Sequence, residues 1–401
     1  MNIMNLNYFS IMEAADKEML HSAMLRFLLH NVPPVRELFA PFSPQGDDLR
    51  ISLEEKVAAK KVKISARFDV VARSGEGPFE HILIVENKFK SFPATAQLTR
   101  YDQILQENAK KFPNPVKYLL CFDAAALTGG GAGEEWAASG KAAPWHIVSY
   151  NCIRAALSHW LENAEQDILA ETRVLCHHYV TFLEAYYTTF NKICEDYSAA
   201  FCTLKEQEKA EQDAERMLAP SAKLLANPAH APNFWQTLVL HQVGLTLEKR
   251  LRGEFGDAAC KAAMEGRLIV HSGGASSTPC VNIQPPHWPG GNGKKPSVCI
   301  QVQGRDIKLY IDNLKGLKTA GAREKVLGYA RKLRELLGDE SGVADTMMQS
   351  HARRSNSFSV YKSRFLPSGD CKAGIAILAD RVWDFYQRAD GAIKQAGPFP
   401  A

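Results

Sequence analysis

The chain has 401 residues, of which 46% are hydrophobic and 23% charged, and its formal net charge is +4 at pH 7. Two domains with separate cores fit this length, and the composition is that of an ordinary globular protein rather than a disordered or membrane-spanning one. Nine cysteines without a Cys-x-x-Cys pair argue against a zinc ribbon or a disulfide framework. Since the first residues show no pattern typical of a signal peptide, we expect a cytoplasmic protein without a membrane segment.

The first 150 residues predict a helix, three strands, a second helix and further strands. Leu20, Met24, Leu25 and Leu28 recur at helical spacing and predict a helix over 11–30. Pro33-Pro34 follows the expected end of this helix. Apolar runs bounded by turn residues predict strands over 49–57, 63–73, 81–88, 116–122 and 146–150, with a helix over 94–110. The Gly/Ala-rich stretch 124–143 predicts a surface loop.

The rest of the chain changes character twice. Residues 152–219 predict helices, and the almost purely polar stretch 205–216 indicates an exposed helix between two domains. An α+β module follows, with helices over 233–253, 320–338 and 372–388 and strands over 267–271, 279–284, 297–303, 306–311 and 357–365. We therefore expect a first domain over 1–190, a helical connector over 191–230 and an α+β module over 231–401.

The segment that says most about function is Glu86-Asn87-Lys88, at the end of an apolar run of strand length. Side chains two positions apart in a strand share a face, so Glu86 and Lys88 should point the same way. Asp69 lies in another apolar run upstream, which suggests that it is buried. Buried charges are costly unless they bind something. Two acids and a lysine could hold a hard cation and a water beside a phosphate, although Glu86 and Lys88 could also form a surface salt bridge of little value.

Together these residues resemble the PD-(D/E)XK nuclease superfamily over roughly 8–150, in the branch whose N-terminal helix carries a Glu followed by His-Ser. The residues that carry the resemblance are, in chain order, Glu18, His21-Ser22, Asp69, Glu86-Asn87-Lys88, Gln97 and Tyr101. Phe68 stands where the superfamily name places a proline. The resemblance implies an α/β, restriction-endonuclease-like core in the order αβββαβ, with a mixed sheet flanked by helices.

The resemblance also implies a metal site. Asp69 and Glu86 would be direct ligands of Mg²⁺, with the backbone carbonyl of Asn87 as a third ligand and Mn²⁺ able to substitute. Glu18 would hold a second metal or a metal-bound water, although an acid in the first turn of a helix is common for dipole reasons alone. Lys88 would orient the attacking water or stabilise the developing charge, and a nearby dication should lower the pKa of Lys88.

Further residues would support this site. Gln97 would position Lys88 or a phosphate, and Tyr101, one turn further on, would either support the same cluster or merely pack. Lys61, Lys63 and Arg67 lead into the strand of Asp69 and would attract a phosphate backbone. The same residues would also suit a solvated edge strand that uses lysines against aggregation.

We therefore expect a Mg²⁺-dependent nuclease that acts on DNA, in a setting of defence against foreign DNA. Two other functions stay open: a nucleic-acid-binding or assembly protein that no longer cuts, and a phosphoesterase for RNA or nucleotides. The resemblance allows a homodimer, since many such enzymes cut both strands as dimers. The C-terminal module would recognise a substrate, an activating partner or a signal.

Overall fold

The computed structural model divides the chain into two compact units, Met1–Phe190 with Leu204–Ala231, and Asn191–Thr203 with Pro232–Ala401. It describes residues 18–42, 48–59, 63–75, 81–89, 95–123, 135–136, 144–163, 169–195, 231–256, 269–271, 280–285, 287–289, 296–303, 306–312, 314, 317, 319–338, 357–364 and 374–400. Most of the expected connector, 191–230, lies outside these residues, so the expected domain boundaries stay a prediction.

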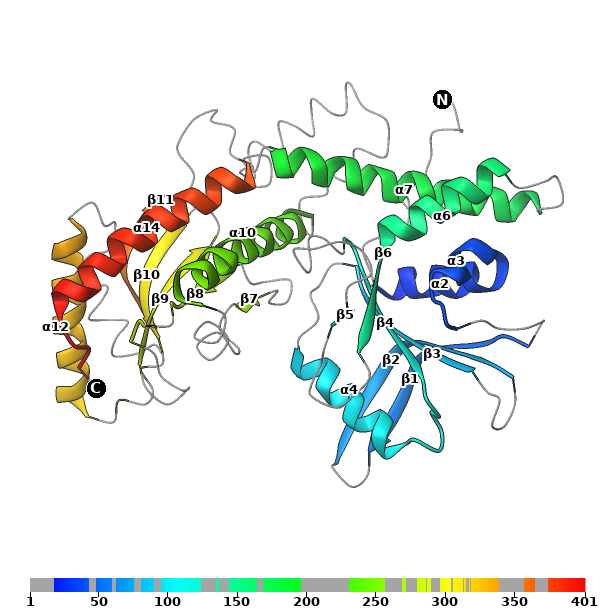
Figure 1. The fold of residues 1–401 in the computed structure, drawn as a ribbon, viewed down its shortest axis with the longest axis horizontal. Coiled ribbons are helices and arrows are strands. Elements are labelled where there is room, and N and C mark those ends of the chain that lie inside the picture. The colour runs from blue at the N-terminus through cyan, green and yellow to red at the C-terminus, as the bar shows by residue number, and fades with distance from the viewer. Residues whose placement is uncertain are drawn as a thin grey trace. The chain divides into compact units, whose positions relative to one another are not determined.

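A six-stranded mixed sheet forms the centre of the first unit, in the order β1-β2-β3-β4-β6-β5 (Figure 1). The strands are β1 (Arg50–Ala59), β2 (Ile64–Ser74), β3 (His81–Lys88), β4 (Val116–Cys121), β5 (Glu135–Trp136) and β6 (Trp145–Ser149). Strands β1, β2 and β3 pair antiparallel, whereas β3, β4 and β6 are parallel. The helices are α2 (Glu18–Asn31), α3 (Pro33–Glu37), α4 (Thr95–Glu107), α6 (Tyr150–Asn163) and α7 (Ala170–Glu195).

Strand β3 lies in the interior of the first unit, because both of its faces are covered. Its residues from Ile82 to Asn87 are all buried, as expected for a strand that has a parallel neighbour and helices on both sides. One face packs on α4, where Ile82 and Ile84 join Leu98 and Tyr101 in a single hydrophobic cluster. Figure 1 shows α4 on this side of the sheet and α2 with α3 on the other. The alternation of side chains along β3 therefore sends neighbouring residues to opposite helices.

Strands β1 and β2 are irregular at one position. Glu54 has φ 55° and lies between the pairs Leu53–Val70 and Glu55–Phe68, opposite Asp69. A positive φ at a residue other than glycine is strained and tends to be kept where function needs it. The face of β2 turned to α4 also changes here, because Phe68 and Val71, three positions apart, belong to the same cluster. Asp69 thus lies where the strand departs from regular alternation.

The expected order of helix, three strands, helix and strand is confirmed, with ends shifted by a few residues. Two expectations were incomplete. Pro33-Pro34 ends one helix but also begins α3, since proline is well suited to the first turn of a helix. The stretch 124–143 was expected to be a loop, yet Glu135–Trp136 form β5, which pairs antiparallel with β6 and is the last strand of the sheet. Residues 11–17 of the first expected helix lie outside the described part.

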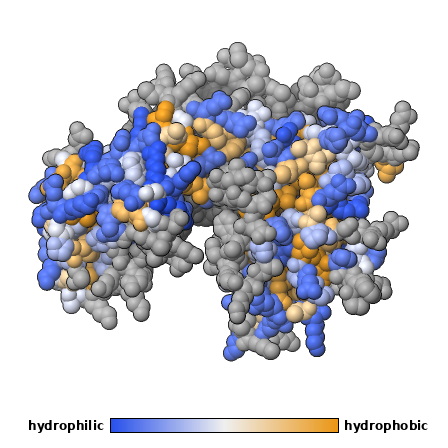
Figure 2. Space-filling view, in the orientation of Figure 1, coloured by the Kyte–Doolittle hydropathy of each residue, from blue (hydrophilic) through white to orange (hydrophobic). Residues whose placement is uncertain are grey.

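The second unit is an α+β module, as expected. Its sheet is antiparallel in the order β11-β10-β9-β8-β7. The strands are β7 (Ile269–His271), β8 (Cys280–Ile283), β9 (Ser297–Gln303), β10 (Asp306–Asp312) and β11 (Phe358–Arg364), and the helices are α10 (Ala231–Phe255), α12 (Ala320–Leu337) and α14 (Ile375–Ala396). No helix in the described part of the chain is long and apolar enough to span a membrane. Figure 2 shows hydrophilic residues over much of the visible described surface of this unit.

One buried ion pair fixes α4 to the sheet. Lys117 of β4 and Asp102 of α4 are 5% and 4% exposed, and the Lys117 Nζ lies 2.7 Å from the Asp102 Oδ1. The Trp145 Nε1 donates to the same Asp102 oxygen at 3.2 Å. Removing one partner of such a pair leaves the other charge buried without compensation.

We therefore expect Lys117→Met to lower the free energy of unfolding by about 3 kcal/mol, measured by urea unfolding. The double variant Lys117→Met with Asp102→Leu should recover most of this loss, because neither charge is then buried. The control Lys111→Met removes an exposed lysine that pairs with Glu55 and should cost less than about 1 kcal/mol. Equal losses for the two single lysine variants would show that the buried pair has no special role.

Candidate active site

The acid and the lysine at the end of β3 form a buried pair. Glu86 and Lys88 point to the same face, and the Lys88 Nζ lies 2.8 Å from the Glu86 Oε1. The side chain of Glu86 is 1% exposed and that of Lys88 12%. A salt bridge on the surface was the alternative interpretation, and this burial excludes it. A buried pair must be held by its surroundings because taking two charges out of water is costly.

Asp69 joins this pair because the sheet opens beside it. The pairing of β2 with β3 runs from Ser74–His81 to Val70–Val85 and ends there. The backbone N–H of Asn87 then donates to the Asp69 Oδ2 at 2.8 Å. Asp69 is therefore held next to Glu86 by an interaction between side chain and backbone. Burial and the charge of Glu86 raise the pKa of Asp69 to about 8.

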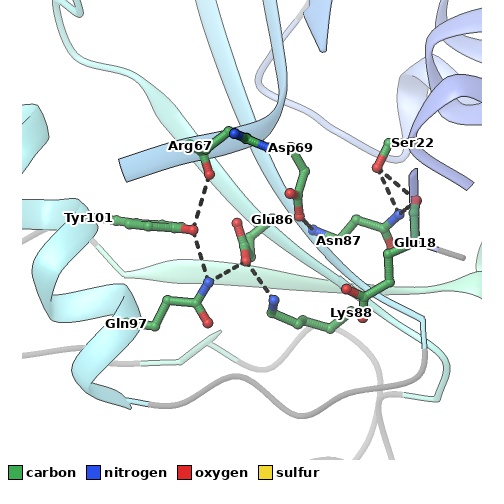
Figure 3. A network of polar contacts seen from close by, with 9 residues as sticks. All are labelled: Glu18, Ser22, Arg67, Asp69, Glu86, Asn87, Lys88, Gln97 and Tyr101. Atoms are coloured by element: carbon green, nitrogen blue, oxygen red, sulfur yellow. Dashed lines mark hydrogen bonds and ion pairs between the residues drawn. The ribbon is translucent and has the colours of Figure 1, made fainter. Parts of the chain in front are cut away.

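The two oxygens of Glu86 have different surroundings. Its Oε1 accepts from the Gln97 Nε2 at 2.7 Å and from Lys88 (Figure 3). Its Oε2 is buried and has no hydrogen-bond partner among the described residues. Burial raises the pKa of Glu86, and the positive charge of Lys88 only partly offsets this effect. An unpartnered carboxylate oxygen in a buried position is costly, so it suits a cation or a proton.

Helix α4 supplies the groups that orient Glu86. The Gln97 Nε2 also donates to the Tyr101 hydroxyl at 2.9 Å, and that hydroxyl donates to the backbone carbonyl of Arg67 at 3.2 Å (Figure 3). Burial and the charge of Glu86 raise the pKa of Tyr101 to about 12. Tyr101 both packs in the core and supports the cluster through Gln97. The roles predicted for Gln97 and Tyr101 in catalysis or substrate binding stay predictions.

Helix α2 brings Glu18 to the other side of the cluster. The Asn87 Nδ2 donates to the backbone carbonyl of Glu18 at 2.9 Å and to the Ser22 Oγ at 3.0 Å. The negative charge of Glu18 is among the causes that raise the pKa of Asp69 and Lys88. Burial alone would lower the pKa of Lys88, but the charges of Glu86 and Glu18 outweigh it and raise this pKa. The lowering expected for Lys88 therefore requires the positive charge of a dication.

His21 has a structural place. It is fully buried, its ring stacks on Phe89 with centroids 3.7 Å apart, and its Nδ1 lies 2.9 Å from the Tyr179 hydroxyl. These contacts anchor α2 to α7 and confirm that His21 packs in the interior. Sequence reasoning missed the side chain of Asn87 and the hydroxyl of Tyr150, which donates to the Asn87 Oδ1 at 2.7 Å. No sequence pattern marks this contact, because the two residues are 63 positions apart.

Two basic residues at the start of β2 are at the surface. Lys63 and Arg67 are exposed, and the Arg67 Nη1 lies 2.9 Å from the Glu54 Oε2. Lys61 lies outside the described residues. Contact of Lys61, Lys63 and Arg67 with a substrate stays a prediction.

The cluster suits a hard cation that is held mainly by water. Within the described residues, no group of three or more His, Cys, Asp or Glu side chains is arranged to hold a metal ion. Mg²⁺ does not need such a cage, since it is often bound by one or two carboxylates and keeps several waters. Asp69 and Glu86 supply two carboxylates, and the buried Glu86 Oε2 lacks a partner among the described residues. The residues therefore fit a divalent cation held by oxygen ligands.

A comparison with protein families agrees with this geometry. Residues 6–184 match the model of the PD-(D/E)XK nuclease superfamily. The match agrees with the resemblance inferred from the sequence, and Asp69, Glu86 and Lys88 lie within the matched region. No match was found among curated proteins, and none among solved structures.

The raised pKa of Asp69 predicts how stability depends on pH. Between the ordinary pKa of 3.8 and the folded pKa of about 8, the folded chain keeps a proton that the unfolded chain has lost. Stability should therefore fall as the pH rises through this range in the presence of EDTA. We expect Asp69→Asn to remove this contribution and to raise the free energy of unfolding by about 2 kcal/mol near pH 8.

Urea unfolding between pH 5 and 9 measures this effect. The matched control is Glu162→Gln, which neutralises an exposed acid of α6 in the same unit. Parallel stability curves for Asp69→Asn and the unmodified chain would contradict the assignment of the proton to Asp69.

Proposed function

We propose that the first unit is a metal-dependent nuclease that hydrolyses phosphodiester bonds in DNA. The observation that carries the proposal is the buried cluster of Asp69, Glu86 and Lys88 at the opening between β2 and β3. It lies within the region that matches the nuclease superfamily. Two carboxylates are more than one lysine can neutralise, which supports a positively charged ligand at this position.

Asp69 and Glu86 would hold the cation, with the backbone carbonyl of Asn87 as a third ligand. Glu18 would bind it through water or help to hold a second cation. When bound, Mg²⁺ or Mn²⁺ supplies positive charge that polarises a phosphate oxygen and activates a water. The support for this assignment is the Glu86 Oε2, which is buried without a partner among the described residues.

The chain itself would orient the reacting groups. Gln97 holds the Glu86 Oε1 in place, which would leave the Oε2 available to a cation. Lys88 is kept protonated by Glu86 and Glu18, which raise its pKa. A protonated ammonium carries three N–H donors. This favours a role in which Lys88 donates hydrogen bonds to the charge developing on the phosphate, rather than one in which it takes a proton from water.

The exposed basic residues support a polyanionic substrate. Arg67 lies on the strand of Asp69 and Lys63 directly before that strand, and each Lys or Arg that neutralises a phosphate strengthens binding by releasing counterions. The full proposal has DNA as the polymer, defence against foreign DNA as the setting and the cytoplasm as the location. A homodimer would allow both strands to be cut, and the second unit would respond to a partner or a signal.

The test is cleavage of plasmid DNA and of linear single- and double-stranded DNA with Mg²⁺, Mn²⁺ or EDTA. We expect cutting that requires metal and that falls about 100- to 1000-fold in Lys88→Ala, because one donor to the transition state is lost. Asp69→Asn should lose both cleavage and binding of Mn²⁺, since a ligand is removed.

The matched control is Lys111→Ala, which removes a lysine paired with a glutamate in the same unit but away from the cluster. It should cut like the unmodified chain. Binding of DNA without cutting would favour a silent binding protein, and cutting of RNA or nucleotides alone would favour another phosphoesterase. Equal cutting by Lys88→Ala and the unmodified chain would disprove the assigned site.

A further inference from the structure

The side chain of Asn87 lies on the opposite face of β3 from Glu86 and Lys88. It is fully buried, and both ends of its amide are bound. The Nδ2 donates to the Glu18 carbonyl at 2.9 Å and to the Ser22 Oγ at 3.0 Å (Figure 3). The Oδ1 accepts from the Tyr150 hydroxyl at 2.7 Å. Since a backbone carbonyl can only accept, the Glu18 carbonyl fixes the Nδ2 end of the amide towards α2, and the hydrogen bond from the Tyr150 hydroxyl to the Oδ1 supports this orientation.

The Glu18 carbonyl also accepts a hydrogen bond from a residue of its own helix. The Ser22 Oγ donates to the same Glu18 carbonyl at 3.0 Å, one turn away. Glu18 is thus held through its backbone, which leaves its carboxylate directed to the cluster of Asp69, Glu86 and Lys88. The influence of Glu18 on the charges of Asp69 and Lys88 agrees with this placement.

A single residue therefore joins two of the acids. The backbone N–H of Asn87 donates to Asp69, while its side chain donates to the backbone of Glu18. Neither hydrogen bond involves the side chain of Glu86 or Lys88, which lie on the other face of β3. A leucine of similar size could occupy the space but could make none of the three side-chain hydrogen bonds.

We propose that the side chain of Asn87 is a positioning residue that holds Glu18 at the metal-binding cluster, through the backbone carbonyl of Glu18. This inference rests on the proposed nuclease function and adds to it. The role assigned to Asn87 in metal binding used only its backbone carbonyl, whereas the side chain acts on a different acid. Groups that orient metal ligands commonly affect metal affinity or activity by about 10- to 100-fold.

The test is a double-mutant cycle between Asn87→Leu and Glu18→Gln. Two quantities are measured for each variant: the Kd for Mn²⁺ by titration calorimetry, and kcat/KM for cleavage of plasmid DNA. We expect Asn87→Leu to weaken both by about 10-fold or more in the unmodified chain. In the Glu18→Gln background it should change each by less than about 2-fold, because the group through which it acts is already lost. Equal losses in both backgrounds would overturn the inference.

Two further variants separate positioning from general destabilisation. Tyr150→Phe removes only the hydroxyl that orients the Asn87 amide and should show the same dependence on Glu18 with a smaller loss. It also provides the cycle if Asn87→Leu does not fold. Asn108→Leu is the matched control, since Asn108 likewise donates to two backbone carbonyls, those of Ala58 and Ile104, at the end of α4 away from Gln97. It should leave both measured quantities unchanged.

The two readouts distinguish failure of the inference from failure of the proposed function. A chain that binds Mn²⁺ but cuts no nucleic acid would contradict the nuclease proposal, and the cycle in Mn²⁺ affinity would still decide the role of Asn87. An active chain without coupling between positions 87 and 18 would contradict the positioning role alone. A chain that neither binds Mn²⁺ nor cuts would overturn both.

Discussion

The burial of two carboxylates beside each other is the constraint on which the rest of the first unit depends. Asp69 and Glu86 repel each other when both are charged, and burial raises the pKa of each. The single ammonium of Lys88 compensates only part of this charge, and Glu18 adds a further negative charge nearby. An arrangement that is unfavourable for the folded chain alone persists where a ligand or a reaction requires it. The surrounding helices can be understood as the structure that holds these acids together.

Side chains alternate along β3, so the groups that position the acids lie on both faces of this strand. Glu86 and Lys88 face α4, where Gln97 and Tyr101 fix one carboxylate oxygen. Asn87 faces α2 and α6 and fixes Glu18 there. Three consecutive residues of one strand thus contact groups from the helices on both faces of the sheet. This explains why β3 is buried on both faces, and why the sheet must open at Asp69 for the acid to reach the amide of Asn87.

Much of this structure could be predicted from local patterns. Helices and strands follow from periodicity, and the acids of β2 and β3 stand out because charges are rare in apolar strands. The parts that could not be predicted depend on contacts between distant residues. Tyr150 reaches Asn87 across 63 positions, and Asn87 reaches Glu18 across 69. The positive φ of Glu54 likewise has no local signature, since glutamate rarely adopts it. Strand β5 is also defined by its pairing with β6, a contact that the local sequence does not indicate.

A proton and a cation would compete for the same carboxylate oxygens at this site. With a pKa of about 8, Asp69 holds a proton at neutral pH beside the ammonium of Lys88 when no cation is bound. A cation that uses the Asp69 oxygens must displace that proton, so metal affinity at such a site rises with pH until the carboxyl has ionised. Lys88 is paired with the Glu86 Oε1 in the same cluster, so a cation held by Glu86 would share that carboxylate with the ammonium. The same buried acids that are unfavourable for the folded chain alone would thus be occupied by a proton at low pH and by a cation at higher pH.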